Sequence, residues 1–211
     1  MDNVLIIGAH YDDAELGAGG TAAKLLSQGK KVYKITLTDT EVFSTDMNLD
    51  IKGSTAMQNS KDACIAIGGV EEIAIHQEKY GNLEFNQQLM QEIEHIITEK
   101  KIDTVFFHYI SDYNSDHLAA HKISKVASRH CDNLFMFQSN PYITDQGFAP
   151  NCFIDISGFI DKKEKALKCY EKDHDRQGRL FESNIERNRL WGYGNGVKEA
   201  EGFVCIKCLI S

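Results

Sequence analysis

Apolar runs and amphipathic stretches alternate along the chain. Residues 3–10 (NVLIIGAH) and 102–109 (IDTVFFHY) are almost continuously apolar, which is typical of strands buried on both faces of a parallel sheet. Residues 31–39 (KVYKITLTD) alternate between apolar and polar side chains, which also indicates a strand. Further strands are predicted at 70–76, 133–139, 152–157 and 201–210.

Helical stretches separate these strands. Residues 16–30 place Leu25 and Leu26 on one face before a stop at Gly29, and residues 86–101 carry an apolar stripe. Because strands and helices alternate, the pattern predicts an α/β fold: a doubly wound, mostly parallel sheet with helices on both faces. Further helices are predicted at 54–69, at 115–130, entered through Asp116, and at 160–174.

Nothing in the sequence divides the chain into parts. There is no internal repeat, no low-complexity segment and no Pro-rich linker, since Pro141 and Pro150 are the only prolines. The 211 residues are 42% hydrophobic and 26% charged, which is ordinary for a soluble protein with one sizeable core. We therefore expect a single domain over residues 1–211.

Charge and hydropathy limit the partners. The formal net charge of −8 argues against binding to nucleic acid or to an anionic membrane surface. No apolar run reaches the length of a membrane span. The N-terminus lacks the basic region and cleavage site of a signal peptide, so we expect a cytoplasmic protein. No heptad repeat marks an interface between subunits, and the sequence leaves open whether the protein forms a homo-oligomer.

Six cysteines include one close pair, Cys205 and Cys208, in the sequence CIKC. A lone C-x-x-C inside an alternating apolar tail, without a second pair, is a weak signal for zinc. A strand that carries reduced thiols is the favoured interpretation.

Two polar loops follow buried strands and carry the groups that bind divalent metals. Ligands of such sheets bind at the carboxyl ends of the strands, so we expect these loops to meet. A cation such as Zn²⁺ between them would offset the repulsion of the adjacent carboxylates Asp12 and Asp13. One carboxylate could then bind the metal while the other acts on water as a general base. The loops carry His10, Asp12 and Asp13, and then Asp112, Asn114, Asp116 and His117.

These motifs resemble the LmbE-like, or PIG-L, family of zinc-dependent N-deacetylases. Residues 9–21 (AHYDDAELGAGGT) resemble its motif A-H-x-D-D-x-E-x-G, and residues 112–117 (DYNSDH) resemble its second motif. Residues 152–157 (CFIDIS), 160–170 (IDKKEKALKCY) and 200–203 (AEGF) resemble later fragments in the same order. The resemblance implies a Rossmann-like sheet and a hydrolase that removes an N-acyl group, usually N-acetyl, from a small amino-sugar conjugate.

The resemblance also implies roles for single residues. His10, Asp13 and His117 match the ligands of Zn²⁺ or another divalent metal. Asp12 matches the general base. Asp116 matches a carboxylate that orients a histidine.

The sequence departs from the family at two places. Asn114 stands where many members carry a histidine that stabilises the oxyanion, and an amide donates a hydrogen bond without a charge. His108 and His121 are candidate replacements, and His121 is also a candidate substrate contact. Ala56 and Asn59 stand where members often carry R-x-x-E, which puts a usual substrate contact in doubt.

Two further segments near these motifs suggest structure as well as function. Glycines flank Trp191 and Tyr193 within residues 189–203, so we expect a flap there, with Tyr193 as a substrate contact.

The sequence GAGG at 17–20 is out of register with a dinucleotide motif, and its glycines favour close packing of a helix on the sheet. Glu15 either turns toward the site or serves as an ordinary acid of the first helical turn.

Two other functions stay open. The departures at Asn114, Ala56 and Asn59 are compatible with a metal-binding protein that has lost catalysis. The same metal chemistry would also suit an amidase on a non-sugar N-acyl or N-formyl substrate.

Overall fold

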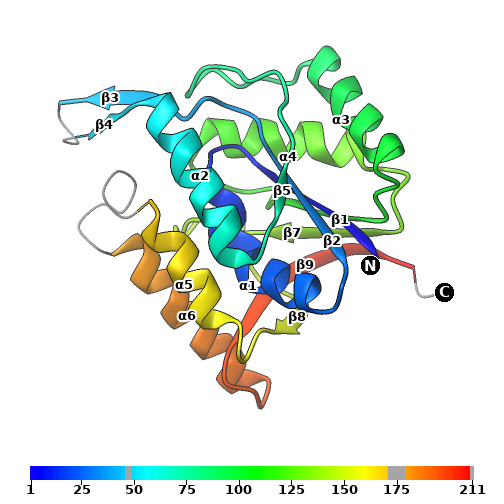
Figure 1. Cartoon of the computed structure of the whole chain (residues 1–211), viewed down its shortest axis with the longest axis vertical. Helices are drawn as coiled ribbons and strands as arrows, with labels where there is room; N and C mark the ends of the chain where they lie inside the picture. Colours follow the sequence, from blue (N-terminus) through cyan, green and yellow to red (C-terminus); the bar gives the residue numbers. More distant parts are fainter. Residues whose placement is uncertain (46–48, 171–178, 210–211) are drawn as a thin grey trace.

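The computed structural model describes residues 1–45, 49–170 and 179–209 (Figure 1). Its centre is a seven-stranded sheet in the order β5-β2-β1-β6-β7-β9-β8, and β3 and β4 pair separately as a hairpin. The strands are β1 (Asn3–Gly8), β2 (Lys31–Thr36), β3 (Val42–Ser44), β4 (Leu49–Ile51), β5 (Glu71–Glu72), β6 (Thr104–His108), β7 (Asn133–Phe137), β8 (Cys152–Asp155) and β9 (Ala200–Cys208).

Helices lie on both faces of the sheet (Figure 1). Neighbouring side chains of one strand point to opposite faces, so Phe106 packs under α1, α2, α5 and α6, and Phe107 packs under α3 and α4. The helices are α1 (Asp13–Ser27), α2 (Gly53–Ile67), α3 (Gln87–Glu99), α4 (Ser115–Ala127), α5 (Ile160–Lys168) and α6 (Leu180–Gly194).

The predicted fold class is confirmed. Strands β5, β2, β1, β6 and β7 run parallel to one another. Strand β9 runs antiparallel to β7 and to β8, which makes the sheet mixed but mostly parallel. Cys205 and Cys208 both lie on β9 as free thiols, as the strand interpretation predicts.

Some element predictions differ from the structure. Helix α6 and the β3–β4 hairpin were not predicted, and α6 occupies part of the segment expected to be a flap. The strand expected at 70–76 is reduced to Glu71–Glu72. Helix α5 ends at Lys168, residues 171–174 of its predicted range lie outside the described residues, and so does residue 210 of the predicted last strand.

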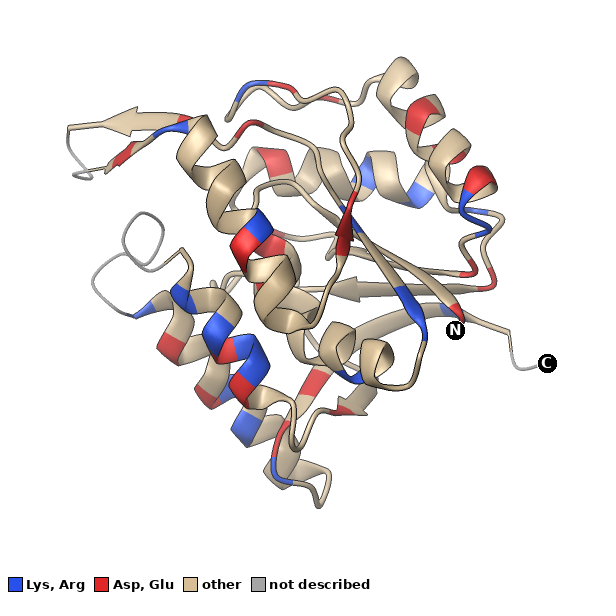
Figure 2. Ribbon diagram, in the orientation of Figure 1, with Lys and Arg blue, Asp and Glu red and all other residues tan. Residues whose placement is uncertain are grey.

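Basic and acidic residues are interspersed along α5 and α6 (Figure 2). This distribution is typical of helices with one face in solvent, as the charge-rich sequence of α5 indicates. In the described parts of the chain, no helix is both long and apolar enough to cross a membrane.

Two later motif residues, Lys163 and Glu201, hold a kink in α1. The helix breaks at Ala18, whose φ is −144°. The Glu201 carboxylate accepts hydrogen bonds from the backbone N–H groups of residues 20 and 21, and Lys163 Nζ donates to Glu201 and to the Leu16 carbonyl. The buried ion pair therefore satisfies the backbone groups that the kink would leave unpaired.

The strand order reverses between β1 and β6, because the chain proceeds from β1 outward through β2 on one side and from β6 through β7 on the other. Such a switch point leaves a crevice at the carboxyl ends of the two strands. The polar loops at residues 9–13 and 109–114 follow these two ends, as expected from the sequence.

Candidate active site

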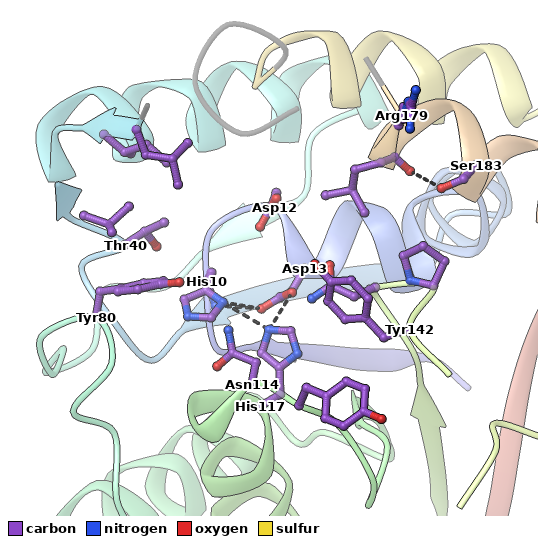
Figure 3. Close-up of a pocket in the computed structure, with 17 residues that line it drawn as sticks. His10, Asp12, Asp13, Thr40, Tyr80, Asn114, His117, Tyr142, Arg179 and Ser183 are labelled. Carbon is purple, nitrogen blue, oxygen red and sulfur yellow. Dashed lines mark hydrogen bonds and ion pairs between the residues drawn. The ribbon is translucent and has the colours of Figure 1, made fainter. Parts of the chain in front are cut away.

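A pocket of about 700 Å³ opens at this switch point. The hairpin β3–β4, residues 140–142 and the first turn of α6 contribute its walls. Figure 3 shows side chains from both polar loops converging at its floor. The structure thus brings together most of the candidate residues predicted from the sequence: His10, Asp12, Asp13, Asn114 and His117.

His10, Asp13 and His117 form a tight triangle of possible metal ligands (Figure 3). His10 Nδ1 lies 3.1 Å from His117 Nε2 and 3.4 Å from Asp13 Oδ2, and His117 Nε2 lies 3.3 Å from Asp13 Oδ1. Ligands of a tetrahedral zinc with bonds near 2.0–2.1 Å stand about 3.3 Å apart. The spacing and the donor set therefore both fit a zinc-like dication.

The electrostatics of the triangle also favour a cation. Burial alone would lower the pKa of His117, but the charge of Asp13 and a hydrogen bond to Asp112 raise it to about 10. Burial alone would raise the pKa of Asp13, but the neighbouring imidazoles of His117, His108 and His10 hold it well below its usual range. The carboxylates thus hold buried positive charge at this point.

Each ligand histidine is oriented by its own carboxylate. Asp112 Oδ2 lies 2.9 Å from His117 Nδ1, and Asp116 Oδ2 lies 3.1 Å from His10 Nε2. Asp116 also accepts hydrogen bonds from the backbone N–H groups of residues 81 and 83. The resemblance implied this kind of role for Asp116. The sequence placed Asp112 only among the possible metal-binding groups of its loop, although its position five residues before His117 was a usable signal.

Asn114 begins helix α4. Its side-chain oxygen accepts a hydrogen bond from the Asp116 N–H at 2.8 Å, so Asn114 is the N-cap and Asp116 lies in the first turn. The expectation that this helix is entered through Asp116 is therefore wrong, because the helix begins two residues earlier at its cap Asn114. Capping uses the amide oxygen of Asn114. Its amide nitrogen can therefore donate a hydrogen bond to a ligand in the pocket, which this residue lines.

Asp12 and Asp13 are adjacent but occupy different parts of the floor. Asp13 belongs to the ligand triangle, whereas the Asp12 carboxylate lies apart from it and faces the pocket (Figure 3). Asp12 is the N-cap position of α1 and Asp13 is its first residue, so their side chains leave the backbone in different directions.

His108 and His121 lie behind the site rather than in it. His108 stacks on the His117 ring with centroids 4.1 Å apart, and its Nε2 lies 3.1 Å from Asp13 Oδ2. His121 Nδ1 donates to the His108 carbonyl at 2.9 Å. Neither ring lines the pocket, so the structure brings neither to a substrate.

Tyr193 does not lie at the pocket either. It is near the C-terminal end of α6 and 87% exposed, whereas the first turn of α6 lines the pocket. The expectation of a flap at 189–203 is wrong, because helix α6 and strand β9 contain most of that segment. The aromatic pocket residues Tyr80, Tyr113 and Tyr142 were not predicted, and their loop sequences carry no periodic signal.

The fold and the site define an α/β protein with a buried His–Asp–His centre at the switch point of its sheet. The chain belongs to the PIG-L family, described as GlcNAc-PI de-N-acetylase, whose profile matches residues 5–128. The resemblance noted in the sequence is thereby confirmed, and the family is one of deacetylase enzymes.

Individual proteins support the same placement. The chain is 28% identical over 172 residues to the uncharacterized deacetylase YaiS of Escherichia coli, a match that covers 78% of this chain and 88% of that protein. The N,N'-diacetylchitobiose deacetylase of Pyrococcus horikoshii shares the fold with a TM-score of 0.82 and 18% identity, over 98% of this chain and 84% of that one.

The same fold also supports other chemistry. GalB, a 4-carboxy-2-hydroxymuconate hydratase of Pseudomonas putida, has a TM-score of 0.80 and 19% identity, over 100% of this chain and 98% of that one. The reaction must therefore be argued from the site and not from the fold.

Proposed function

We propose that this protein is a metal-dependent hydrolase that removes an N-acyl group, in the first instance N-acetyl, from an amino-sugar conjugate. The observation that carries the proposal is the His10–Asp13–His117 triangle at the pocket floor, with the Asp12 carboxylate beside it. The family and the two deacetylases described above support the reaction class.

Zn²⁺ is the metal that this donor set suits best, since two imidazoles and one carboxylate leave a fourth position open. When bound, the cation supplies Lewis-acid chemistry that acidifies water and polarises an acyl oxygen. Asp112 and Asp116 keep the ligand nitrogens of His117 and His10 directed at that point.

Asp12 moves the proton in this proposal. Its carboxylate takes a proton from water, the water oxygen bonds to the acyl carbon, and the C–N bond breaks. Asp12 then returns the proton to the amine nitrogen, so that the products are a carboxylic acid and a free amine. The Asn114 amide donates a hydrogen bond to the acyl oxygen as negative charge develops there.

The pocket suits a substrate much larger than an acetamide. Its volume of about 700 Å³ leaves room for a sugar ring and part of a conjugate beyond the acyl group. Tyr113 and Tyr142 line it with ring centroids 6.4 Å apart. Their rings can pack against the apolar C–H face of a sugar, which supports the amino-sugar class.

The first test is metal analysis of the purified protein and of His117→Ala. About one zinc per chain, lost in the variant, is expected from the triangle. Absence of metal after reconstitution of the wild type would overturn the proposal. Acetate and formate release is then measured on a panel of acetamido sugars and simple amides.

Asp12→Asn should retain the metal and lose turnover, because its amide cannot take a proton from water. Metal binding without hydrolysis of any substrate would favour a non-catalytic metal-binding protein. Release from simple formamides alone would favour a non-sugar amidase.

A further inference from the structure

Lys34 is a buried cation in the central sheet. It lies on β2, is 1% exposed, and its side chain reaches the face of the sheet that α1, α2 and α5 cover. An ammonium group in such a place is unfavourable unless each of its protons has a partner. The contacts of the Lys34 ammonium group therefore show which parts of the structure it stabilises.

Within the described residues, Lys34 Nζ has four hydrogen-bond partners, of which Tyr170 Oη is the farthest at 3.3 Å. Lys34 Nζ lies 2.8 Å from Glu15 Oε1, 2.9 Å from Ser60 Oγ and 2.5 Å from the Tyr11 carbonyl oxygen. Ser60 in turn donates to Glu72 at 2.7 Å. Glu15, in the first turn of α1, thus turns inward to Lys34 and does not line the pocket, so the expectation that it turns toward the site is not met.

The pKa directions fit a charged pair around Lys34. Burial alone would lower the pKa of Lys34, but the carboxylate of Glu15 raises it well above its ordinary value. Burial raises the pKa of Glu15, an effect that the ammonium opposes.

The Tyr11 carbonyl receives a second buried donor. Tyr170, two residues after the end of α5, donates its hydroxyl to this oxygen at 2.8 Å, so both lone pairs of the oxygen are used. The Tyr11 N–H donates to Thr40 Oγ1 at 3.2 Å, and the Asp12 carbonyl accepts from Leu16 N at 3.0 Å. Hydrogen bonds therefore hold the carbonyl of the peptide that joins Tyr11 to Asp12 and also the backbone on either side of this peptide.

We propose that Lys34 and Tyr170 position Asp12, because both donate hydrogen bonds to the carbonyl of the preceding residue, Tyr11. We call these two hydrogen bonds the clamp. The proposal rests on the proposed role of Asp12 as the base. The ligand histidines have separate supports, since Asp116 orients His10 and Asp112 orients His117. Loss of the clamp should therefore move the Asp12 carboxylate more than the ligand triangle, and so reduce the rate of the proton step without removing the metal.

Tyr170→Phe is the mildest test, because it removes one hydroxyl from a buried ring. We expect kcat to fall about ten- to a hundredfold, with KM within about twofold and the metal content unchanged. Tyr33→Phe is the matched control: Tyr33 is the buried neighbour of Lys34 on β2, and its ring packs on the opposite face of the sheet. An unchanged kcat in Tyr170→Phe, or an equal fall in both variants, would overturn the proposal.

Crystal structures give a readout that does not depend on a substrate. In Tyr170→Phe and in Lys34→Met/Glu15→Leu, which replaces the whole ion pair by apolar groups, the Asp12 carboxylate should be displaced or spread over several positions. His10, Asp13 and His117 should stay in place. An Asp12 carboxylate that keeps its position in both variants would overturn the clamp. A wild type that hydrolyses no substrate would instead count against the proposed function, and these structures would still decide the clamp.

Discussion

The Asp112 carboxylate and the His117 imidazole lie 2.9 Å apart, from Oδ2 to Nδ1. When His117 is neutral, as a ligand of a cation must be, this contact sets its tautomer, because a proton on Nδ1 leaves the lone pair of Nε2 directed toward His10 and Asp13. Asp116 makes the equivalent contact with His10. Residues 112–117, from the second polar loop into the first turn of α4, therefore supply one candidate metal ligand and the two carboxylates that orient His10 and His117.

We predict that Asp112→Asn weakens metal binding about 10- to 100-fold, because an amide orients the imidazole but does not increase its basicity. Competition with a chromophoric chelator measures the affinity. Asp161→Asn, an exposed change in the first turn of α5, is the control and should bind as the wild type does. Equal affinities of the Asp112 variant and the control would show that this contact does not tune His117.

Asn114 has two separable contributions, capping of α4 and hydrogen-bond donation in the pocket. Asp is as good an N-cap as Asn but, when ionised, it has no proton to donate. We therefore predict that Asn114→Asp keeps the thermal stability while kcat falls about 10²-fold or more. Asn114→Ala should lose about 1 kcal/mol of stability as well. Full activity in Asn114→Asp would exclude the proposed contact with the acyl oxygen.

Tyr142 tests the proposed sugar contact. We predict that Tyr142→Ala raises KM for acetamido sugars several-fold and changes kcat little, because the ring binds the substrate and its transition state alike. Tyr193→Ala serves as the control: the sequence selected Tyr193 as a substrate contact, but it lies far along α6 from the pocket. If KM rose equally in both variants, a role of the Tyr142 ring in substrate binding would be ruled out.

The sequence predicted the elements that have a single periodic pattern. Strands β1 and β6 are buried on both faces, and α3 carries a clear apolar stripe. Helix α6 was missed because its buried face includes Asn184 and Asn188 among apolar residues. Asn184 donates to the Leu16 carbonyl, so this face is polar for a tertiary reason that no periodicity shows. The antiparallel direction of β9 is likewise set by its neighbours in space.

In the candidate site, too, some features could be predicted from the sequence, whereas others depend on contacts between distant residues. The meeting of the two polar segments could be predicted from their residue types and the two strand ends, and the resemblance to the PIG-L family implied the choice of His10, Asp13 and His117 within them. The partner of Asp116 could not be predicted, since Asp116 turns from its sequence neighbour His117 toward His10 across the site. The inward turn of Glu15 depends on Lys34, which is distant in sequence.

The glycines of α1 were expected to allow close packing on the sheet, and Gly17 does so. A Cβ at Gly17 would overlap the ring of Phe137 at the end of β7, and that ring also contacts His108 behind the His10–Asp13–His117 triangle. We predict that Gly17→Ala lowers stability by about 1–3 kcal/mol, because this overlap outweighs the helical preference of about 1 kcal/mol for alanine. The melting temperature should fall by about 2–4 °C for each kcal/mol in a chain of this size. Gly147→Ala, where a Cβ meets open space, is the control. Adding Phe137→Leu to Gly17→Ala should recover part of the loss, whereas a higher melting temperature in Gly17→Ala alone would show that the contact is not tight.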